Sequence, residues 1–318
     1  MKSRVGGSLI YFLIVVMLLV MRISGSVGIY DALGVDSDAF FTSIVQLCCF
    51  GLLPVLGWWI IVGRCKKDQI GVLADTFYLK KCSIKHFGFT LLITVPLLLV
   101  TGAVSYVWNG VLSATGFQHP SSTPVEQTVA NLFVQIVLTA VLPGIFEELT
   151  HRGLVLGTLR ENGWRAVPMS ALLFALMHQY IPQTGYTFVL GLALAALTFY
   201  TGSIFPAMLV HFFNNFVSVI SDFDGLVPAF GVIDSASGWL YGTLLGNIVV
   251  MLAAAASVAL AAVVLNRIRS DGVEKGLFPK NSLTPAAEGA LPLHRDFALW
   301  GVIAIGIAAT GFSFVWRI

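Results

Sequence analysis

Long apolar runs alternate with short polar connections along almost the whole chain. About 20 consecutive apolar residues cross the hydrocarbon core of a bilayer. On that rule the sequence predicts helices near 8–29, 39–63, 86–108, 127–159, 164–180, 184–201, 203–221, 238–266 and 296–316. The run 127–159 is too long for one plain span at 1.5 Å per residue, and Pro143-Gly144 within it predicts a kink or break. The pattern predicts an all-α polytopic membrane helix bundle of eight or nine transmembrane helices.

Composition agrees with a chain that is surrounded by membrane lipids. Of the 318 residues, 57% are hydrophobic and 11% are charged, whereas soluble domains carry about 25% charged residues. The mean hydropathy is +0.87. A formal net charge of +2 is too small to indicate a nucleic-acid partner. The four cysteines show no C-x-x-C spacing, which argues against a zinc knuckle or a disulfide framework.

Lysine and arginine fall in alternate connections between the predicted helices. They occupy the N-terminus and the connections 64–85, 160–165 and 267–295, whereas the intervening loops 30–38, 109–126, 179–183 and 221–237 contain none. Because cytoplasmic loops carry the positive excess, we expect a multi-pass protein of the cell membrane with a cytoplasmic N-terminus. The chain divides into N-terminal transmembrane helices (1–126), core helices (127–220) and C-terminal transmembrane helices (221–318). The C-terminal part includes a cytoplasmic linker over 270–294.

Ionisable side chains inside the predicted spans concentrate in three short stretches, 146–152, 174–178 and 211–215. Such groups are costly in a membrane and usually mark function. If 127–159 and 164–180 form a hairpin that turns between residues 162 and 163, Glu147 and His178 each lie 15.5 residues from the turn. Both then sit about 23 Å along their helices, at the same depth.

The third stretch reaches a similar depth from the next turn. His211 and Asn215 are predicted roughly 14 to 20 Å up their helix from Gly202, and they share a face, as Glu148 and Arg152 do, because each pair is spaced i,i+4. A carboxylate, two imidazoles and an amide in a low-dielectric site suit amide hydrolysis. We expect Glu147 and His178 to activate a water, His211 and Asn215 to stabilise the oxyanion, and Arg152 to hold Glu148 ionised.

Three motifs, E-E-x-x-x-R, F-x-x-x-H and H-x-x-x-N, follow one another in that order. This pattern resembles the CPBP family (CAAX protease and bacteriocin-processing, also called Abi or type II CAAX prenyl endopeptidase). The resemblance covers about residues 127–220 and implies an intramembrane glutamic endopeptidase that acts on a membrane-anchored or prenylated peptide or protein, with no required metal. The matching positions are Glu147, Glu148, Arg152, Phe174, His178, His211 and Asn215.

Other interpretations stay open at this point. Glu148 and Arg152 alone fit a buried ion pair of a transporter, and His211 and Asn215 fit polar contacts that join helices. Glu147, His178 and His211 have the ligand types of a zinc metalloprotease, although the H-E-x-x-H signature is absent. His151 is interpreted as structural or interfacial. A non-proteolytic member of the same family would act as a membrane scaffold, as a regulator of a partner such as a sensor kinase, or as a bacteriocin-immunity protein.

Overall fold

The described part of the chain is an assembly of helices without strands. The computed structural model describes residues 2–27, 42–63, 68–118, 126–226, 228–274 and 291–316. The prediction of an all-α polytopic bundle is therefore confirmed. The elements are α1 (Lys2–Ser26), η1 (Val45–Leu52), α4 (Leu53–Ile61), α5 (Gln69–Thr76), α6 (Ile84–Ala114), α7 (Val129–Gln135), η3 (Ile136–Val141), α8 (Leu142–Glu148), η4 (Leu149–Leu156), α9 (Gly157–Leu159), η5 (Arg160–Arg165), α10 (Ala166–Met177), α11 (Ile181–Thr201), α12 (Phe205–Ser221), α13 (Pro228–Gly242), α14 (Leu244–Glu274), η6 (Leu293–Arg295) and α15 (Phe297–Trp316).

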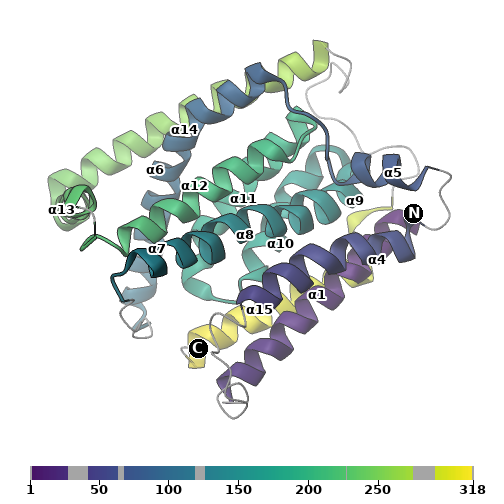
Figure 1. Ribbon diagram of the computed structural model, residues 1–318, viewed down its shortest axis with the longest axis horizontal. Coiled ribbons are helices and arrows are strands. Elements are labelled where there is room, and N and C mark those ends of the chain that lie inside the picture. The colour runs from purple at the N-terminus through teal and green to yellow at the C-terminus, as the bar shows by residue number, and fades with distance from the viewer. Residues whose placement is uncertain are drawn as a thin grey trace.

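The helices form three neighbouring groups (Figure 1). Helices α6 and α14 pack together on one side, and α1, α4 and α15 lie on the other. Helices α8, α10, α11 and α12 fill the centre between them. The three predicted polar stretches all belong to this central group, so the flanking helices shield them from the surroundings.

Seven described stretches are long and apolar enough to cross a membrane. One of them, Val129–Met177, contains the predicted hairpin, and Phe205–Ser221 is a shorter apolar helix. Each of the nine predicted ranges therefore has a helical counterpart. The part of the predicted second helix that precedes Thr42 lies outside the described residues.

The arm that carries the glutamates is not broken at Pro143-Gly144, where the sequence predicted a kink or break. The backbone stays helical from Val129 to Leu159, and π-helical turns over Ile136–Val141 lead directly into α8. Pro143 stands at the start of α8, where π-helical hydrogen bonding has already replaced the regular i→i−4 pattern, so the missing proline N–H does not break the helix. A second π-helical segment, η4, follows the glutamates.

Three connections contain helix where the sequence predicted none. Helix α5 occupies the connection before α6, and α13 occupies most of the loop predicted over 221–237. Helix α14 continues to Glu274, beyond the predicted start of the linker at 270. The linker residues 275–290 lie outside the described residues.

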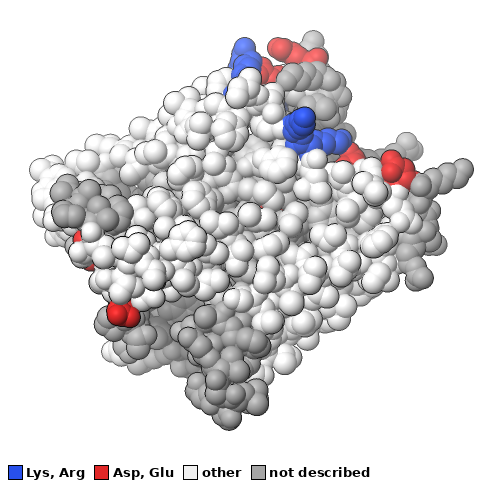
Figure 2. Space-filling model, in the orientation of Figure 1, with Lys and Arg blue, Asp and Glu red and all other residues white. Residues whose placement is uncertain are grey.

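The described charges of the basic connections gather at one end of the bundle. Arg160 pairs with Asp75 (2.6 Å), which also pairs with Lys80 (2.5 Å). Asp271 at the end of α14 pairs with Lys85 at the start of α6 (2.6 Å). Figure 2 shows Lys and Arg together near this end, acidic atoms alone near the opposite end, and an uncharged band between them. This distribution matches a helix bundle embedded in a bilayer.

The predicted hairpin is present, and its turn lies where the sequence placed it. Gly163 has φ 61°, ψ −141°, a backbone conformation that favours glycine. His151 and Phe174, at equal distances along the chain from the turn, contact each other with ring centroids 5.0 Å apart. Glu147 and His178 lie one helical turn further along the two arms, and the hairpin therefore brings them to a common level.

Candidate active site

Two adjacent buried carboxylates form the centre of the site. Glu147 and Glu148 end α8 and are 8% and 0% exposed. Glu147 Oε1 accepts a hydrogen bond from Gln46 Nε2 at 2.8 Å. Glu148 Oε1 lies 2.7 Å from Arg152 Nη1, one helical turn later in η4. Because consecutive residues of a helix project in different directions, the two carboxylates meet different partners.

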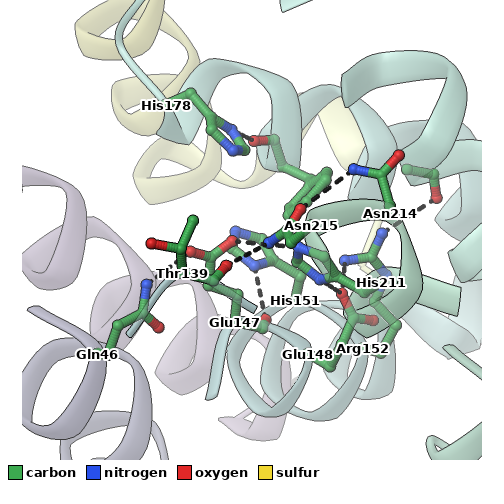
Figure 3. A network of polar contacts seen from close by, with 12 residues as sticks. Gln46, Thr139, Glu147, Glu148, His151, Arg152, His178, His211, Asn214 and Asn215 are labelled. Carbon is green, nitrogen blue, oxygen red and sulfur yellow. Dashed lines mark hydrogen bonds and ion pairs between the residues drawn. The ribbon is translucent and has the colours of Figure 1, made fainter. Parts of the chain in front are cut away.

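His211 of α12 joins the two carboxylates. Its Nδ1 lies 2.8 Å from Glu148 Oε1, and its Nε2 lies 4.0 Å from Glu147 Oε2. Since an ionised carboxylate only accepts hydrogen bonds, Nδ1 is the protonated nitrogen toward Glu148. Gly144 allows this close approach of α12, because a Cβ there would lie 3.3 Å from the Phe212 backbone. Figure 3 shows the Glu147, Glu148, Arg152 and His211 side chains gathered in one network.

His178 stands slightly apart from this network. It caps the end of α10, and its Nδ1 bonds to the Phe174 carbonyl oxygen at 2.9 Å. Because a carbonyl oxygen accepts, Nδ1 donates, and Nε2 keeps its lone pair in the neutral ring. Among the described residues no hydrogen bond joins His178 to Glu147, and in Figure 3 the His178 ring lies apart from the Glu147 carboxylate.

Phe174 is the common neighbour of the basic side chains. Its ring contacts His178 and His211 edge-on, with centroids 5.1 and 5.6 Å away. The Arg152 guanidinium carbon lies 4.4 Å from the ring centroid, a cation–π arrangement that stabilises a desolvated cation. The phenylalanine of F-x-x-x-H thus separates the two imidazoles and fixes their spacing.

Asn215 lies one turn above His211 on α12, and its amide is already oriented. Its Nδ2 donates to the Thr139 carbonyl oxygen at 3.0 Å, and its Oδ1 accepts from Asn214 Nδ2 at 3.1 Å. One N–H of Nδ2 remains for a further acceptor. The side chain is half-buried, so an incoming group can reach it.

His151 has a structural position. It is fully buried, its Nδ1 lies 2.8 Å from the Glu147 carbonyl oxygen, and its Nε2 lies 3.0 Å from the Tyr11 hydroxyl. Tyr11 in turn donates to the Leu173 carbonyl oxygen at 2.9 Å. This chain of contacts ties α1 to both arms of the hairpin, and it excludes an interfacial position for His151.

Two contacts of the site escaped the sequence reasoning. Gln46 and Tyr11 lie far from the three motifs along the chain, on η1 and α1. A signal existed for Gln46, since it is a carboxamide within the apolar run 44–61. The pairing of Glu148 with His211 was also not predicted, and it adds to the expected pairing of Glu148 with Arg152.

Three side chains of the site have the chemical types of metal ligands, but their spacing does not form a metal site. Glu147, His178 and His211 offer the oxygen and nitrogen donors of a catalytic zinc site. Among the described residues, however, no three acidic, histidine or cysteine side chains lie close enough together to hold a metal ion.

Comparison with known families supports the resemblance seen in the motifs. Residues 129–217 match a family described as type II CAAX prenyl endopeptidase Rce1-like. A search of the curated proteins gave no match, and neither did a search of the solved structures. The matched segment contains all seven motif residues and the three central helical stretches that carry them. Over residues 129–217 the chain is thus similar to the Rce1-like family of type II CAAX prenyl endopeptidases.

Proposed function

We propose that this protein is an intramembrane endopeptidase that hydrolyses a peptide bond of a membrane-associated or prenylated substrate, with Glu147 as the base that activates water. The observation that carries the proposal is the 4.0 Å separation between Glu147 Oε2 and His211 Nε2. That gap is too long for a direct hydrogen bond, and it suits one small oxygen species between the two groups. Gln46 holds Glu147 by a hydrogen bond to Oε1, and Glu148 holds His211 by a hydrogen bond at Nδ1.

The first chemical step is attack of water on the scissile carbonyl carbon. Glu147, aided by the Nε2 lone pair of His178, takes one proton while the water oxygen forms the new bond. The carbonyl π electrons move to oxygen and produce a tetrahedral oxyanion. The carbon–nitrogen bond then breaks, and the proton held by Glu147 passes to the leaving amine, so that the carboxylate returns to its starting state.

The oxyanion would accept hydrogen bonds from His211 Nε2 and Asn215 Nδ2. His211 Nδ1 already donates to Glu148, so Nε2 donates only when both ring nitrogens carry protons. An imidazolium at His211 would therefore complete the oxyanion site.

The surroundings proposed for this reaction are the cell membrane, with the N-terminus in the cytoplasm and membrane lipids around the bundle. No cofactor is required in this mechanism. Zinc is the alternative, and it would be held by Glu147, His178 and His211. The fully buried Glu148 and Arg152 serve as the charged support of His211 and do not contact the substrate.

The test uses full-length protein in proteoliposomes with a library of prenylated and plain peptides. Wild type should cleave members of the library, and Glu147→Gln and His178→Ala should lose at least about 100-fold in rate, as expected for loss of a general base. Glu161→Gln, the same change at an exposed residue of the hairpin turn, should behave as wild type.

Three outcomes contradict parts of the proposal. Retained cleavage by Glu147→Gln overturns the mechanism. Activity that a chelator abolishes and zinc restores makes the protein a metalloprotease. Absence of cleavage by wild type across the library, together with copurification of a membrane protein, identifies a non-proteolytic scaffold.

A further inference from the structure

Gln46 belongs to the site by position, although it lies outside the segment 129–217 that matches the family. It is part of η1, and 6% of its surface is exposed. The carboxamide is directed at Glu147 from a different helix than the three motifs (Figure 3). A polar side chain buried in an apolar span is kept when it makes useful contacts.

The direction of the hydrogen bond between Gln46 and Glu147 is settled by chemistry. Glu147 as a carboxylate only accepts, so the atom 2.8 Å from its Oε1 must be the amide nitrogen. A hydrogen bond to an ionised group in a low-dielectric environment is roughly twice as strong as one between neutral groups. It also directs Oε2, the other carboxylate oxygen, toward His211.

The helix that carries Gln46 is anchored to the glutamate helix by two further contacts. Thr150 Oγ1 donates to the Phe50 carbonyl oxygen at 2.9 Å. Gly51 lies against Phe146, where an added Cβ would come within 2.9 Å of the ring. These contacts fix the depth and the rotation of η1 relative to α8. The π-helical form of η1 is common at functional positions, and here it places Gln46 beside the base.

The other end of the carboxamide points to a ligand. Gln46 Oε1 is buried and has no hydrogen-bond partner among the described residues. A buried unpaired acceptor is costly, so a donor placed beside this oxygen would be stabilising. The acceptor therefore remains available to an N–H or O–H donor that enters the site.

We propose that Gln46 is a positioning residue for Glu147: its amide nitrogen orients the carboxylate, while its oxygen accepts a hydrogen bond from the bound peptide. This inference rests on the proposed function, since it assigns Gln46 to the support of the base in peptide hydrolysis. It extends the site onto the helix 42–61, beyond the three motifs.

The experiment replaces Gln46 by methionine, which is similar in length but has no N–H donor. We expect Gln46→Met to lower kcat by about 10- to 100-fold, the effect of losing one hydrogen bond to a charged group. Leu47→Met is the matched control, because it introduces the same side chain at the neighbouring, 46% exposed position, and it should retain wild-type kcat. All variants are measured as full-length protein in the same proteoliposomes.

Two additional variants separate positioning from a merely structural role. In a Glu147→Gln background, the further change Gln46→Met should leave the residual kcat unchanged, since Gln46 affects kcat through Glu147, and the lost contact to the peptide should appear in KM. Gln46→Glu should recover activity toward acidic pH, because the new carboxyl can donate to Glu147 only while it is protonated. A structural role would predict additive losses and an unchanged pH profile.

The outcomes distinguish this inference from the proposed function. If wild type cleaves the peptides and Gln46→Met has the same kcat, the inference about Gln46 is overturned but the proposed function is not. Equal losses from Gln46→Met in the wild-type and Glu147→Gln backgrounds also overturn it. A wild-type protein that cleaves nothing in the library overturns the proposed function, and the assignment of Gln46 falls with it.

Discussion

Glu148 Oε1 accepts hydrogen bonds from both His211 Nδ1, at 2.8 Å, and Arg152 Nη1, at 2.7 Å. A single carboxylate oxygen thus joins a cation of the hairpin to an imidazole of α12. The pairing fixes the ring of His211 so that its other nitrogen faces Glu147. Glu148 is consequently more than the partner of a structural arginine: it orients a side chain that we assign to the oxyanion.

The first prediction concerns the unequal roles of the two glutamates in stability. Glu148→Gln leaves the fully buried Arg152 without its counter-ion, and breaking a buried ion pair in this way costs about 3–5 kcal/mol. Glu147→Gln removes no such partner. We expect Glu148→Gln to unfold at a clearly lower temperature than Glu147→Gln, as followed by tryptophan fluorescence in detergent micelles.

The double variant Glu148→Gln with Arg152→Met serves as the control for this prediction. It should regain part of the lost stability, because no unpaired charge remains buried. Equal melting temperatures for the two glutamate variants would show that the ion pair does not stabilise the fold. Both variants are expected to be inactive, so activity alone does not separate them.

The sequence predicted the relationships that depend on spacing along one hairpin. Glu147 and His178 lie at one level because the turn at Gly163 and the rise of the helices determine depth. The grouping of basic connections at one end follows from the same alternation of spans. Local geometry was sufficient for these features, and the structure contains them.

Contacts between separate helices were not predictable from spacing. Whether Gln46 reaches Glu147, or His211 reaches Glu148, depends on how each helix is rotated about its axis. The π-helical segments η1, η3 and η4 change that rotation, since each alters the angle between successive side chains. The contact of Arg22, in the predicted first helix, with the turn beside His178 likewise does not follow from spacing.

A second prediction tests the close contact between α5 and α9. A Cβ on Gly157 would lie 1.9 Å from the Thr76 carbonyl oxygen, a backbone atom that cannot rotate away. Gly157→Ala should therefore separate the two helices and destabilise the protein by about 1–3 kcal/mol. Gly88→Ala, at an exposed helical site with open space around it, is the matched control and should be neutral or slightly stabilising. The melting temperatures of both variants, compared with wild type, test this prediction.

A third prediction follows from the ion pairs of Asp75, which lies in α5 outside the candidate spans. Hydrogen bonds from Lys80 and then Arg160 lower the pKa of this carboxyl below its ordinary value of 3.8. A lowered pKa in the folded state stabilises the protein above pH 3.8, and that contribution is lost as the pH falls through the folded-state pKa. Asp75→Asn should remove this acid dependence.

The size of the Asp75 effect is small because the pair is partly exposed. Surface pairs contribute about 0–1 kcal/mol, so Asp75→Asn should lower the melting temperature only slightly at pH 7. Asp68→Asn provides the matched control in the same helix, since asparagine caps a helix as well as aspartate. Unfolding midpoints measured from pH 3 to pH 7 would contradict the idea if both variants followed the same curve.

The last prediction concerns the turn that follows His178. Arg22 of α1 donates from Nη1 to the carbonyl oxygens of His178 (3.1 Å) and Gln179 (2.8 Å). Gln179 has φ 51°, a left-handed conformation that costs a non-glycine residue about 1–2 kcal/mol. The guanidinium therefore holds a strained backbone that ends α10 at the histidine. Arg22→Met replaces the aliphatic part of the arginine side chain but lacks the N–H donors. It should lower kcat by about 10-fold with little change in KM.

The strained residue itself provides the decisive control. Gln179→Gly removes the cost of the left-handed conformation, so in combination with Arg22→Met it should restore part of the lost kcat, because the turn then needs less support. If Arg22 served only to attach α1, the glycine would not compensate, and the double variant would be as slow as Arg22→Met or slower. Steady-state cleavage rates of the two single variants and the double variant, compared with wild type in the same proteoliposomes, distinguish these results.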